Sequence, residues 1–363
     1  MKENTRLRYH EIYPRIYRII LPLPGDKPGP VNAYIFTGKT VTLLDTGTLK
    51  TVHILEHALA QIGISFSDID QIILTHGHID HYGAARKIIE GSRGLVTVAA
   101  HEEDKSLIEH GMEVPRKQFI KYYQLMGVPL IFQVSFLLIR WLFSYMAENC
   151  RIDRFLSDGE KILMGDYEAT VIATPGHTRG SISLYLEKEG ILFPGDHILG
   201  HITPNAFVTL EADFDLPQRM SQVEFYDSLQ KIEEISPRIV YPAHGEPIQN
   251  VGSTIAMFRE QFSLRQKDIL SILTRGEYTV YQIGRKLFPD ISGKRLPLEI
   301  FLMVSEVYTH LQLLQKEDKV ASYLDKGALY YKINNHKASA LIYRAEKRGR
   351  ISCSVYASAI SCP

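Results

Sequence analysis

Cysteine is scarce in this 363-residue chain, which contains only Cys150, Cys353 and Cys362. Three cysteines are too few for a disulfide-stabilised scaffold and are typical of a protein from a reducing compartment. The amino terminus, MKENTRLRYHEIYPR, also lacks the apolar stretch of a secretory signal peptide. We therefore expect a cytoplasmic protein.

Long uninterrupted apolar runs are absent as well. The closest approach is residues 129–146, a very apolar stretch that four polar residues interrupt. A membrane-spanning helix needs about 20 predominantly apolar residues, so we expect no transmembrane segment. The wider stretch 115–148 is helix-prone, and it predicts a helical insertion that acts as an apolar lid.

The net charge of the whole chain is zero, because 41 Lys and Arg side chains balance 41 Asp and Glu side chains. Residues 1–250 carry 24 basic and 31 acidic side chains, a net charge of −7. Residues 251–350 carry 17 and 10, a net charge of +7. An acidic body joined to a basic module predicts two units with different roles.

The order of β-rich and helical stretches also divides the chain in two. Up to about residue 250, short β-rich runs alternate with amphipathic stretches, which is typical of an α/β fold. Beyond it we predict three helices and then a hairpin over 320–333 that turns at Asp-Lys-Gly. We therefore predict a first domain over residues 1–252, a winged-helix-like domain over 253–335 and a disordered tail over 336–363.

The segment 75–81, THGHIDH, concentrates side chains that bind metal ions. Imidazole nitrogens and carboxylate oxygens suit zinc and its first-row neighbours. A loop at a strand end can point alternate side chains in two directions, so we expect His76 and His78 to serve one ion. Asp80 and His81 would then serve a second.

Three later residues complete the two sites. Each closes a β-rich run beside a glycine, which lets the backbone turn sharply and direct a side chain into a cleft. These residues are His177, Asp196 and His244.

With these residues, the pattern resembles the metallo-β-lactamase fold superfamily over about residues 10–250, and in particular the group that includes β-lactamase-like protein 2. The resemblance implies an αββα sandwich with two metal ions at one edge, zinc in the first place and Mn²⁺ or Fe²⁺ as alternatives. It implies that Asp196 bridges the two ions. The implied ligands are His76, His78 and His177 for the first ion, and Asp80, His81 and His244 for the second.

The resemblance also implies a hydrolytic reaction. Two ions about 3.5–4 Å apart share a hydroxide that forms near neutral pH and attacks a carbonyl. The implied catalytic residues are Asp196, as the bridge, and Asp80, which is one candidate proton donor to the leaving group beside a metal-bound water. Asp45, in LLDTG, is expected to support the ligand loop from behind.

Further residues are expected to contact the substrate. His197 and His201 flank Asp196 in the sequence, and Arg179 follows His177, with Ser181 close by. Trp141 belongs to the predicted lid.

Two functions stay open on the sequence alone. The lid and the acidic body favour hydrolysis of a thioester, ester or lactone of a small apolar acyl-type substrate. The winged-helix-like pattern and the +7 charge favour a metal-dependent endoribonuclease that acts on single-stranded RNA. We predict the first and keep the second as the alternative. The lid surface also predicts a homodimer if no substrate covers it.

Overall fold

The computed structural model describes residues 9–23, 28–111, 116–134, 145–208, 210, 216–292 and 296–334. Trp141 and the predicted tail over 336–363 lie outside these residues. The predicted insertion over 115–148 is described in part.

The first sheet has seven strands in the order β1-β2-β3-β4-β5-β6-β7. Strands β1 to β4 pair antiparallel, and β4 to β7 pair parallel. The carboxyl ends of β4, β5 and β6 therefore meet at one edge. The strands are β1 (Tyr9–Tyr13), β2 (Ile16–Leu21), β3 (Val31–Phe36), β4 (Thr42–Leu44), β5 (Gln71–Ile73), β6 (Thr97–Ala100) and β7 (Arg154–Phe155).

The second sheet has five strands in the order β12-β11-β10-β9-β8. Only β11 and β12 pair parallel, and the other neighbours are antiparallel. The strands are β8 (Lys161–Met164), β9 (Tyr167–Ala173), β10 (Ile182–Leu186), β11 (Ile191–Phe193) and β12 (Ile239–Val240).

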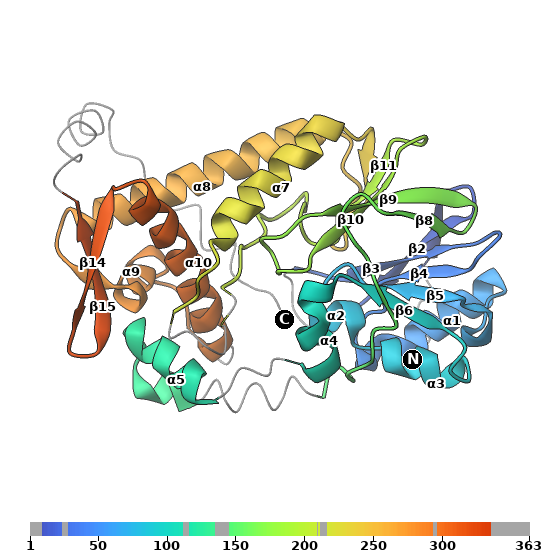
Figure 1. Cartoon of the computed structure of the whole chain (residues 1–363), viewed down its shortest axis with the longest axis horizontal. Helices are drawn as coiled ribbons and strands as arrows, with labels where there is room; N and C mark the ends of the chain where they lie inside the picture. Colours follow the sequence, from blue (N-terminus) through green and yellow to red (C-terminus); the bar gives the residue numbers. More distant parts are fainter. Residues whose placement is uncertain are drawn as a thin grey trace, which may run out of the picture.

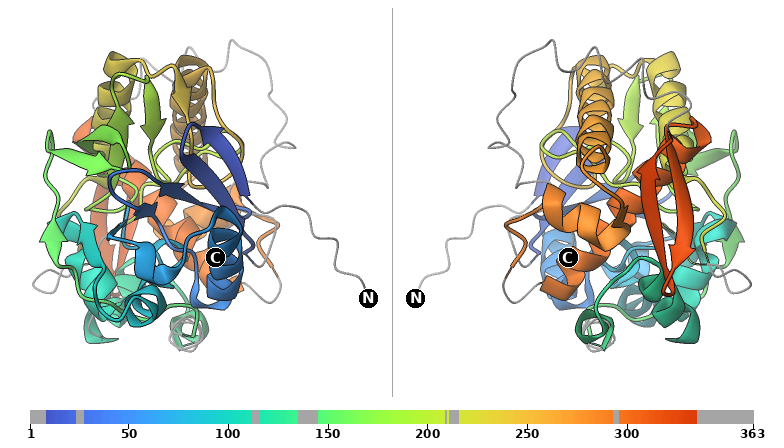
Figure 2. Two further views of the ribbon diagram at one scale, coloured as in Figure 1. Left: turned by 90° about the vertical axis from the view of Figure 1, so that its right-hand side faces the viewer. Right: turned by 90° about the vertical axis from the view of Figure 1, so that its left-hand side faces the viewer.

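The two sheets face each other across an apolar core, in which Phe36 of the first sheet packs with Phe193 of the second. Helices cover both outer faces (Figures 1 and 2). In α1 (Val52–Ile62), Leu55 and Leu59 are buried one turn apart, and they pack against the first sheet. Because α7 (Ser221–Ile235) and α8 (Val251–Leu273) cover the second sheet in the same way, the predicted αββα sandwich is confirmed.

Shorter helices complete the first half of the chain. They are α2 (Ile79–Tyr82), α3 (Ala85–Gly91), α4 (Lys105–His110) and α5 (Arg116–Leu125).

The carboxyl-terminal part contains the three helices and the hairpin that the sequence predicts. Lys326 and Gly327, at the hairpin turn, have φ angles of 47° and 82°, which are typical of a tight two-residue turn. The winged-helix assignment and the domain boundary at residue 252 stay predictions. The elements after α8 are β13 (Tyr278–Thr279), α9 (Val280–Leu287), α10 (Leu296–Lys316), β14 (Val320–Asp325) and β15 (Ala328–Ile333), and we call residues 274–334 the C-terminal module.

Helix α8 links the sandwich to the C-terminal module, as Figure 1 shows. Its first half, with Ile255 and Phe258, packs against the second sheet. Its last turns, with Ile269 and Leu273, belong to the core of the module. One continuous helix therefore contributes to both cores.

The described part of the insertion packs against this same module. Tyr122 of α5 is buried, and its ring lies 6.1 Å from that of Tyr308 on α10. The amide of Tyr281 on α9 donates a hydrogen bond to the carbonyl of Met126, 3.0 Å away. The apolar surface of α5 is thus covered by this chain's own C-terminal module.

Within the described residues, no helix combines the length and the apolar character that crossing a membrane would require.

Candidate metal centre

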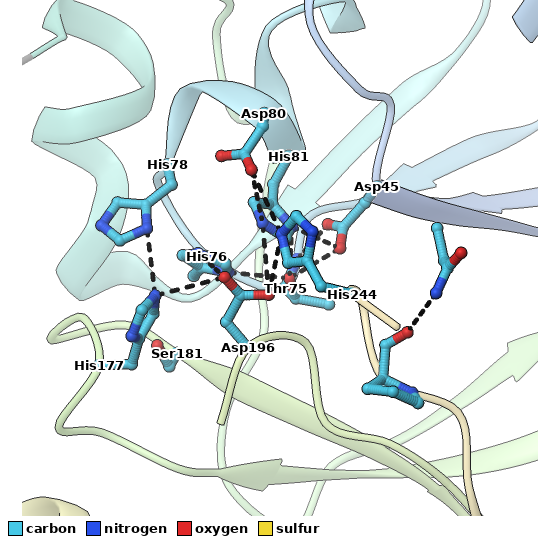
Figure 3. Close-up of polar contacts among 12 residues, drawn as sticks. Asp45, Thr75, His76, His78, Asp80, His81, His177, Ser181, Asp196 and His244 are labelled. Atoms are coloured by element: carbon cyan, nitrogen blue, oxygen red, sulfur yellow. Dashed lines mark hydrogen bonds and ion pairs between the residues drawn. The ribbon is translucent and has the colours of Figure 1, made fainter. Parts of the chain in front are cut away.

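The predicted metal ligands come together at one edge of the sandwich, where strands from both sheets end (Figure 3). His76 and His78 follow β5, and Asp80 and His81 lie on α2 directly after it. The remaining three follow strands of the second sheet: His177 comes after β9, Asp196 after β11 and His244 after β12.

The first group consists of His76, His78, His177 and Asp196, whose candidate ligand atoms all lie within 4.8 Å of one another. His177 Nε2 is 3.2 Å from His78 Nδ1. Its distance to Asp196 Oδ2 is 3.5 Å. Three imidazoles and a carboxylate at this spacing can together bind one first-row metal ion.

The second group consists of Asp80, His81 and His244, and it meets the same distance limit. His244 Nε2 lies 3.3 Å from Asp80 Oδ2, and His81 Nε2 lies 3.8 Å from the same oxygen. All three residues are buried. Burying polar or charged side chains such as these costs free energy unless they have hydrogen-bond partners, opposite charges or a bound ion.

Asp196 lies between the two groups. Its Oδ2 faces the first group, 3.5 Å from His177 Nε2, and its Oδ1 faces the second, 3.6 Å from His81 Nε2 and 3.5 Å from His244 Nε2. The two oxygens of one carboxylate can thus serve two ions at once. The resemblance implies a bridging role for Asp196, and the position of its two oxygens is compatible with that role.

Several ligand atoms are buried without a hydrogen-bond partner among the described residues. They include the Nε2 atoms of His76, His81 and His244 and the Oδ1 atom of Asp196. Buried polar atoms are nearly always paired, so an unpaired cluster of this size needs a ligand. Nitrogen and carboxylate donors fit divalent ions of the zinc type. The residues present therefore fit two divalent metal ions.

Asp45 supports the cluster from behind, as the sequence predicts. Its Oδ2 lies 2.9 Å from His81 Nδ1. It also accepts hydrogen bonds from the Thr75 amide and hydroxyl, each at 2.8 Å. A partner on Nδ1 leaves Nε2 as the nitrogen that faces the second group.

Backbone carbonyls orient two more imidazoles. His177 Nδ1 donates to the carbonyl of Asn205 at 3.0 Å, and His244 Nδ1 donates to that of Pro30 at 3.0 Å. In both rings Nε2 is left for the metal centre. These contacts orient both rings toward the clustered ligand atoms.

The two groups differ in their electrostatics. Burial and the neighbouring imidazoles hold the pKa of His76 well below its ordinary value, and burial lowers the pKa of His78 to about 3. Burial alone would also lower the pKa of His81, but the carboxylates of Asp45 and Asp80 raise it well above its ordinary value. The imidazoles of the first group are therefore neutral, whereas protonated His81 would release its proton when the second group binds an ion.

The predicted substrate contacts have other partners in the structure. His197 is buried, with its ring 4.3 Å from that of Phe225, so it does not line an open wall of the site. Burial lowers the pKa of His197 to about 3. Arg179 forms an ion pair with Glu103, with Nε 2.9 Å from Oε2.

His201 and Ser181 also brace the loops around the site. His201 Nε2 donates to the carbonyl of Pro28 at 2.8 Å. Its ring lies so close to Gly245 that a Cβ on that glycine would be 2.6 Å from His201 Nδ1. Ser181 Oγ accepts from the amide of Thr178 at 3.0 Å. Both contacts hold loops that carry ligands. Trp141 lies outside the described residues.

Two residues near the site were not expected from the sequence. Phe207 places its ring 5.4 Å from that of His78 and 5.1 Å from that of His177, and no sequence signal identifies it. Asp104 is buried and contacts both histidine loops of the first group. Its position just after β6, at the same edge of the sheet, is a signal that could have identified it.

Comparison with known proteins agrees with this geometry. The profile of the metallo-beta-lactamase superfamily matches residues 26–244. A probable metallo-hydrolase of Bacillus subtilis, YqjP, is 29% identical over 310 residues, which cover 84% of this chain and 93% of that protein. A beta-lactamase-like protein 2 homolog from Caenorhabditis elegans is 26% identical, with coverages of 73% and 75%.

Among solved structures, a metallo-beta-lactamase family protein from Thermus thermophilus superposes with a TM-score of 0.75 at 25% identity. It covers 89% of this chain and all of its own. The superfamily profile begins before β3 and ends at His244, the last of the seven clustered residues. This chain accordingly belongs to the metallo-beta-lactamase superfamily and is a hydrolase.

Proposed function

We propose that this protein hydrolyses a thioester, ester or lactone of an apolar acyl-type substrate with the help of two divalent ions, which we expect to be zinc. The observation that carries the proposal is the position of Asp196, with one oxygen toward each of two buried groups of unpaired ligand atoms. Two ions bound there would supply Lewis acidity and a water that loses its proton near neutral pH.

Asp80 is the residue to which we assign the proton transfer. Burial would raise the pKa of Asp80, but the imidazoles of His81 and His244 lower it, so the carboxylate is ionised and can accept a proton. It would take the proton of the attacking water and pass it to the leaving group as the carbon–sulfur or carbon–oxygen bond breaks. The products are then an acid and a thiol or alcohol.

Support for an apolar acyl substrate comes from Phe207, whose ring forms an apolar wall beside His78 and His177. The described part of the predicted lid gives no such support, because α5 is covered by the C-terminal module. Further support comes from a relative named atrochrysone carboxyl ACP thioesterase AacuM, from Aspergillus aculeatus. It is 25% identical over 342 residues, which cover 88% of this chain and 87% of that protein.

Acyl thioesters of increasing chain length test this proposal. Because each buried methylene contributes about 0.8 kcal/mol, four added methylenes should raise kcat/KM by about two orders of magnitude until the pocket is full. Phe207→Ala should flatten this dependence. Phe155→Ala, a change at an exposed aromatic away from the ligands, is the control. If kcat/KM of the unmodified protein does not change with the length of the acyl chain, the proposal of an apolar acyl substrate is contradicted.

The alternative, an endoribonuclease, depends on a basic excess that is unevenly spread along residues 251–350. In the described residues between 251 and 334, 10 basic side chains face 9 acidic ones, a net charge of +1. The basic excess of this half therefore lies in residues 293–295 and beyond 334. Nucleic acid as a partner, a homodimer and a cytoplasmic location stay predictions.

A further inference from the structure

A buried carboxylate outside the ligand set ties together the two loops that carry the histidines of the first group. Asp104 ends the short helical turn Glu102–Asp104 that follows β6. Its Oδ2 accepts from the amide of Gly77 at 2.7 Å and from the hydroxyl of Thr178 at 2.6 Å, and its Oδ1 accepts from the amide of Gly180 at 2.8 Å. Its exposed fraction is 1%.

These partners are neighbours of the ligands. Gly77 stands between His76 and His78, and Thr178 directly follows His177. The first loop comes from the seven-stranded sheet and the second from the five-stranded sheet. One carboxylate thus sets the distance between imidazoles that two different sheets present.

Each of the two loops lies so close to the segment around Asp104 that a side chain larger than glycine would not fit at the contact. A Cβ on Gly77 would lie 2.7 Å from Leu107 Cβ, and one on Gly180 would lie 2.6 Å from the amide nitrogen of Asp104. Glycine is therefore required on each loop where it meets the segment around Asp104. Three hydrogen-bond donors converge on the two carboxylate oxygens of Asp104. The amide of an asparagine at this position would place its own NH₂ group against one of these donors.

The second group has a carboxylate of its own, because Asp45 binds His81 Nδ1 directly. Asp104 instead accepts from two backbone amides and the Thr178 hydroxyl, so it acts through the loops that carry the imidazoles. We propose that Asp104 is a positioning residue that sets the affinity of the first histidine group for its metal ion and leaves the second group unaffected. This inference rests on the proposed two-metal function.

Calorimetric titration of the metal-free protein with Zn²⁺ tests it, in two backgrounds that each keep one group. His81→Ala removes a ligand of the second group, and His78→Ala removes a ligand of the first. Adding Asp104→Asn should weaken zinc binding about 10- to 100-fold in the His81→Ala background, as loss of a supporting partner typically does. It should leave the affinity unchanged in the His78→Ala background.

Two further changes guard against a variant that fails to fold. Thr178→Val removes one donor to Asp104 and should also weaken only the first group, and Thr178→Ser should restore the affinity. Asp153→Asn is the matched control, because Asp153 accepts from the amide of Val98 on β6 and contacts neither histidine loop. It should leave both affinities unchanged.

The outcomes separate the inference from the function beneath it. Unmodified protein that binds two zinc ions, combined with equal weakening of both groups by Asp104→Asn, would show a general loss of structure and overturn the positioning role. Unchanged binding in both backgrounds would overturn it as well. Unmodified protein that binds no zinc would overturn the proposed function itself.

Discussion

His310, on α10, shows how a single buried imidazole can make stability depend on pH. Its exposed fraction is 1%, and its neighbours include the ion pair of Arg265 with Glu306, which has Nε 2.7 Å from Oε1. Burial, together with the charge of Arg265, lowers the pKa of His310 to about 3. The folded protein therefore holds this ring neutral, whereas the unfolded chain protonates it near pH 6.5.

We expect His310→Leu to make the protein less sensitive to acid. Because the folded pKa lies below the unfolded one, the stability linked to this group is present above pH 6.5 and is lost as the pH falls toward 3. The loss is at most about 1.4 kcal/mol per pH unit for one proton. Denaturant unfolding between pH 7 and pH 4.5 measures the slope, which should be shallower in the variant.

His57→Gln, at an exposed position on α1, serves as the control and should keep the slope of the unmodified protein. An equal slope in His310→Leu would mean that His310 is already charged in the folded state.

The sequence predicted the seven candidate ligands because four of them share the motif THGHIDH and the other three each close a β-rich run beside a glycine. Asp104 and Phe207 act through contacts that the fold alone creates. Asp104 accepts from Thr178, 74 positions away in the chain. Phe207 follows no strand. Residues of this kind are found only once two distant loops are placed side by side.

At the scale of elements, α5 packs against the C-terminal module and shares its apolar core. Phe119 packs 4.4 Å from Tyr123 between ring centres, and both belong to the apolar core of the module. The sequence predicted a helix with apolar residues on several faces, and it predicted that a second apolar partner must cover them. Hydrophobic periodicity indicates that a helix surface is buried, but it does not identify the part of the protein that covers it. The C-terminal module could therefore not be identified as the partner of α5 from the sequence.

We expect Tyr122→Ala to destabilise the protein by about 3–5 kcal/mol, because it empties a large buried site between α5 and α10. Tyr122→Phe should be neutral or stabilising, since the Tyr122 hydroxyl is buried without a partner among the described residues. Denaturant unfolding at neutral pH measures both changes.

Ile131→Ala, at a position with an exposed fraction of 71% in the same insertion, provides the control and should change stability little. A small effect of Tyr122→Ala would show that α5 detaches from the module in solution, as a mobile lid would.

At the scale of the whole molecule, the chain segment that follows a candidate ligand also contacts the C-terminal module. The chain runs from Asp196 past Phe207, and the amide of Val208 then donates to Ser305 Oγ on α10 at 2.8 Å. The order of elements along the chain predicted two units. It did not predict that a loop from one unit would connect the ligands to the other, because strand pairing and helix packing are set by contacts distant in sequence.

The charge distribution yields a prediction about nucleic acid. The excess positive charge of residues 251–350 lies in residues 293–295 and beyond 334, so any RNA binding should depend on these stretches and should fall steeply between about 50 and about 200 mM salt. A mobility-shift series with single-stranded RNA measures this. Replacing Lys347, Arg348 and Arg350 by Gln should abolish any low-salt binding, whereas the same change at Arg285 and Lys286 should not.

Tight binding of RNA at about 200 mM salt, with cleavage, would favour the endoribonuclease over the acyl hydrolase.

Metal analysis of the purified protein, paired with hydrolysis of an acyl thioester, tests the central claim most directly. The account predicts two zinc ions per chain, one for each group, and loss of both turnover and one ion in Asp196→Ala. Asp227→Ala, at an exposed carboxylate on α7, should keep two ions and full activity. Fewer than one ion per chain in the unmodified protein, or full activity in Asp196→Ala, would contradict the account.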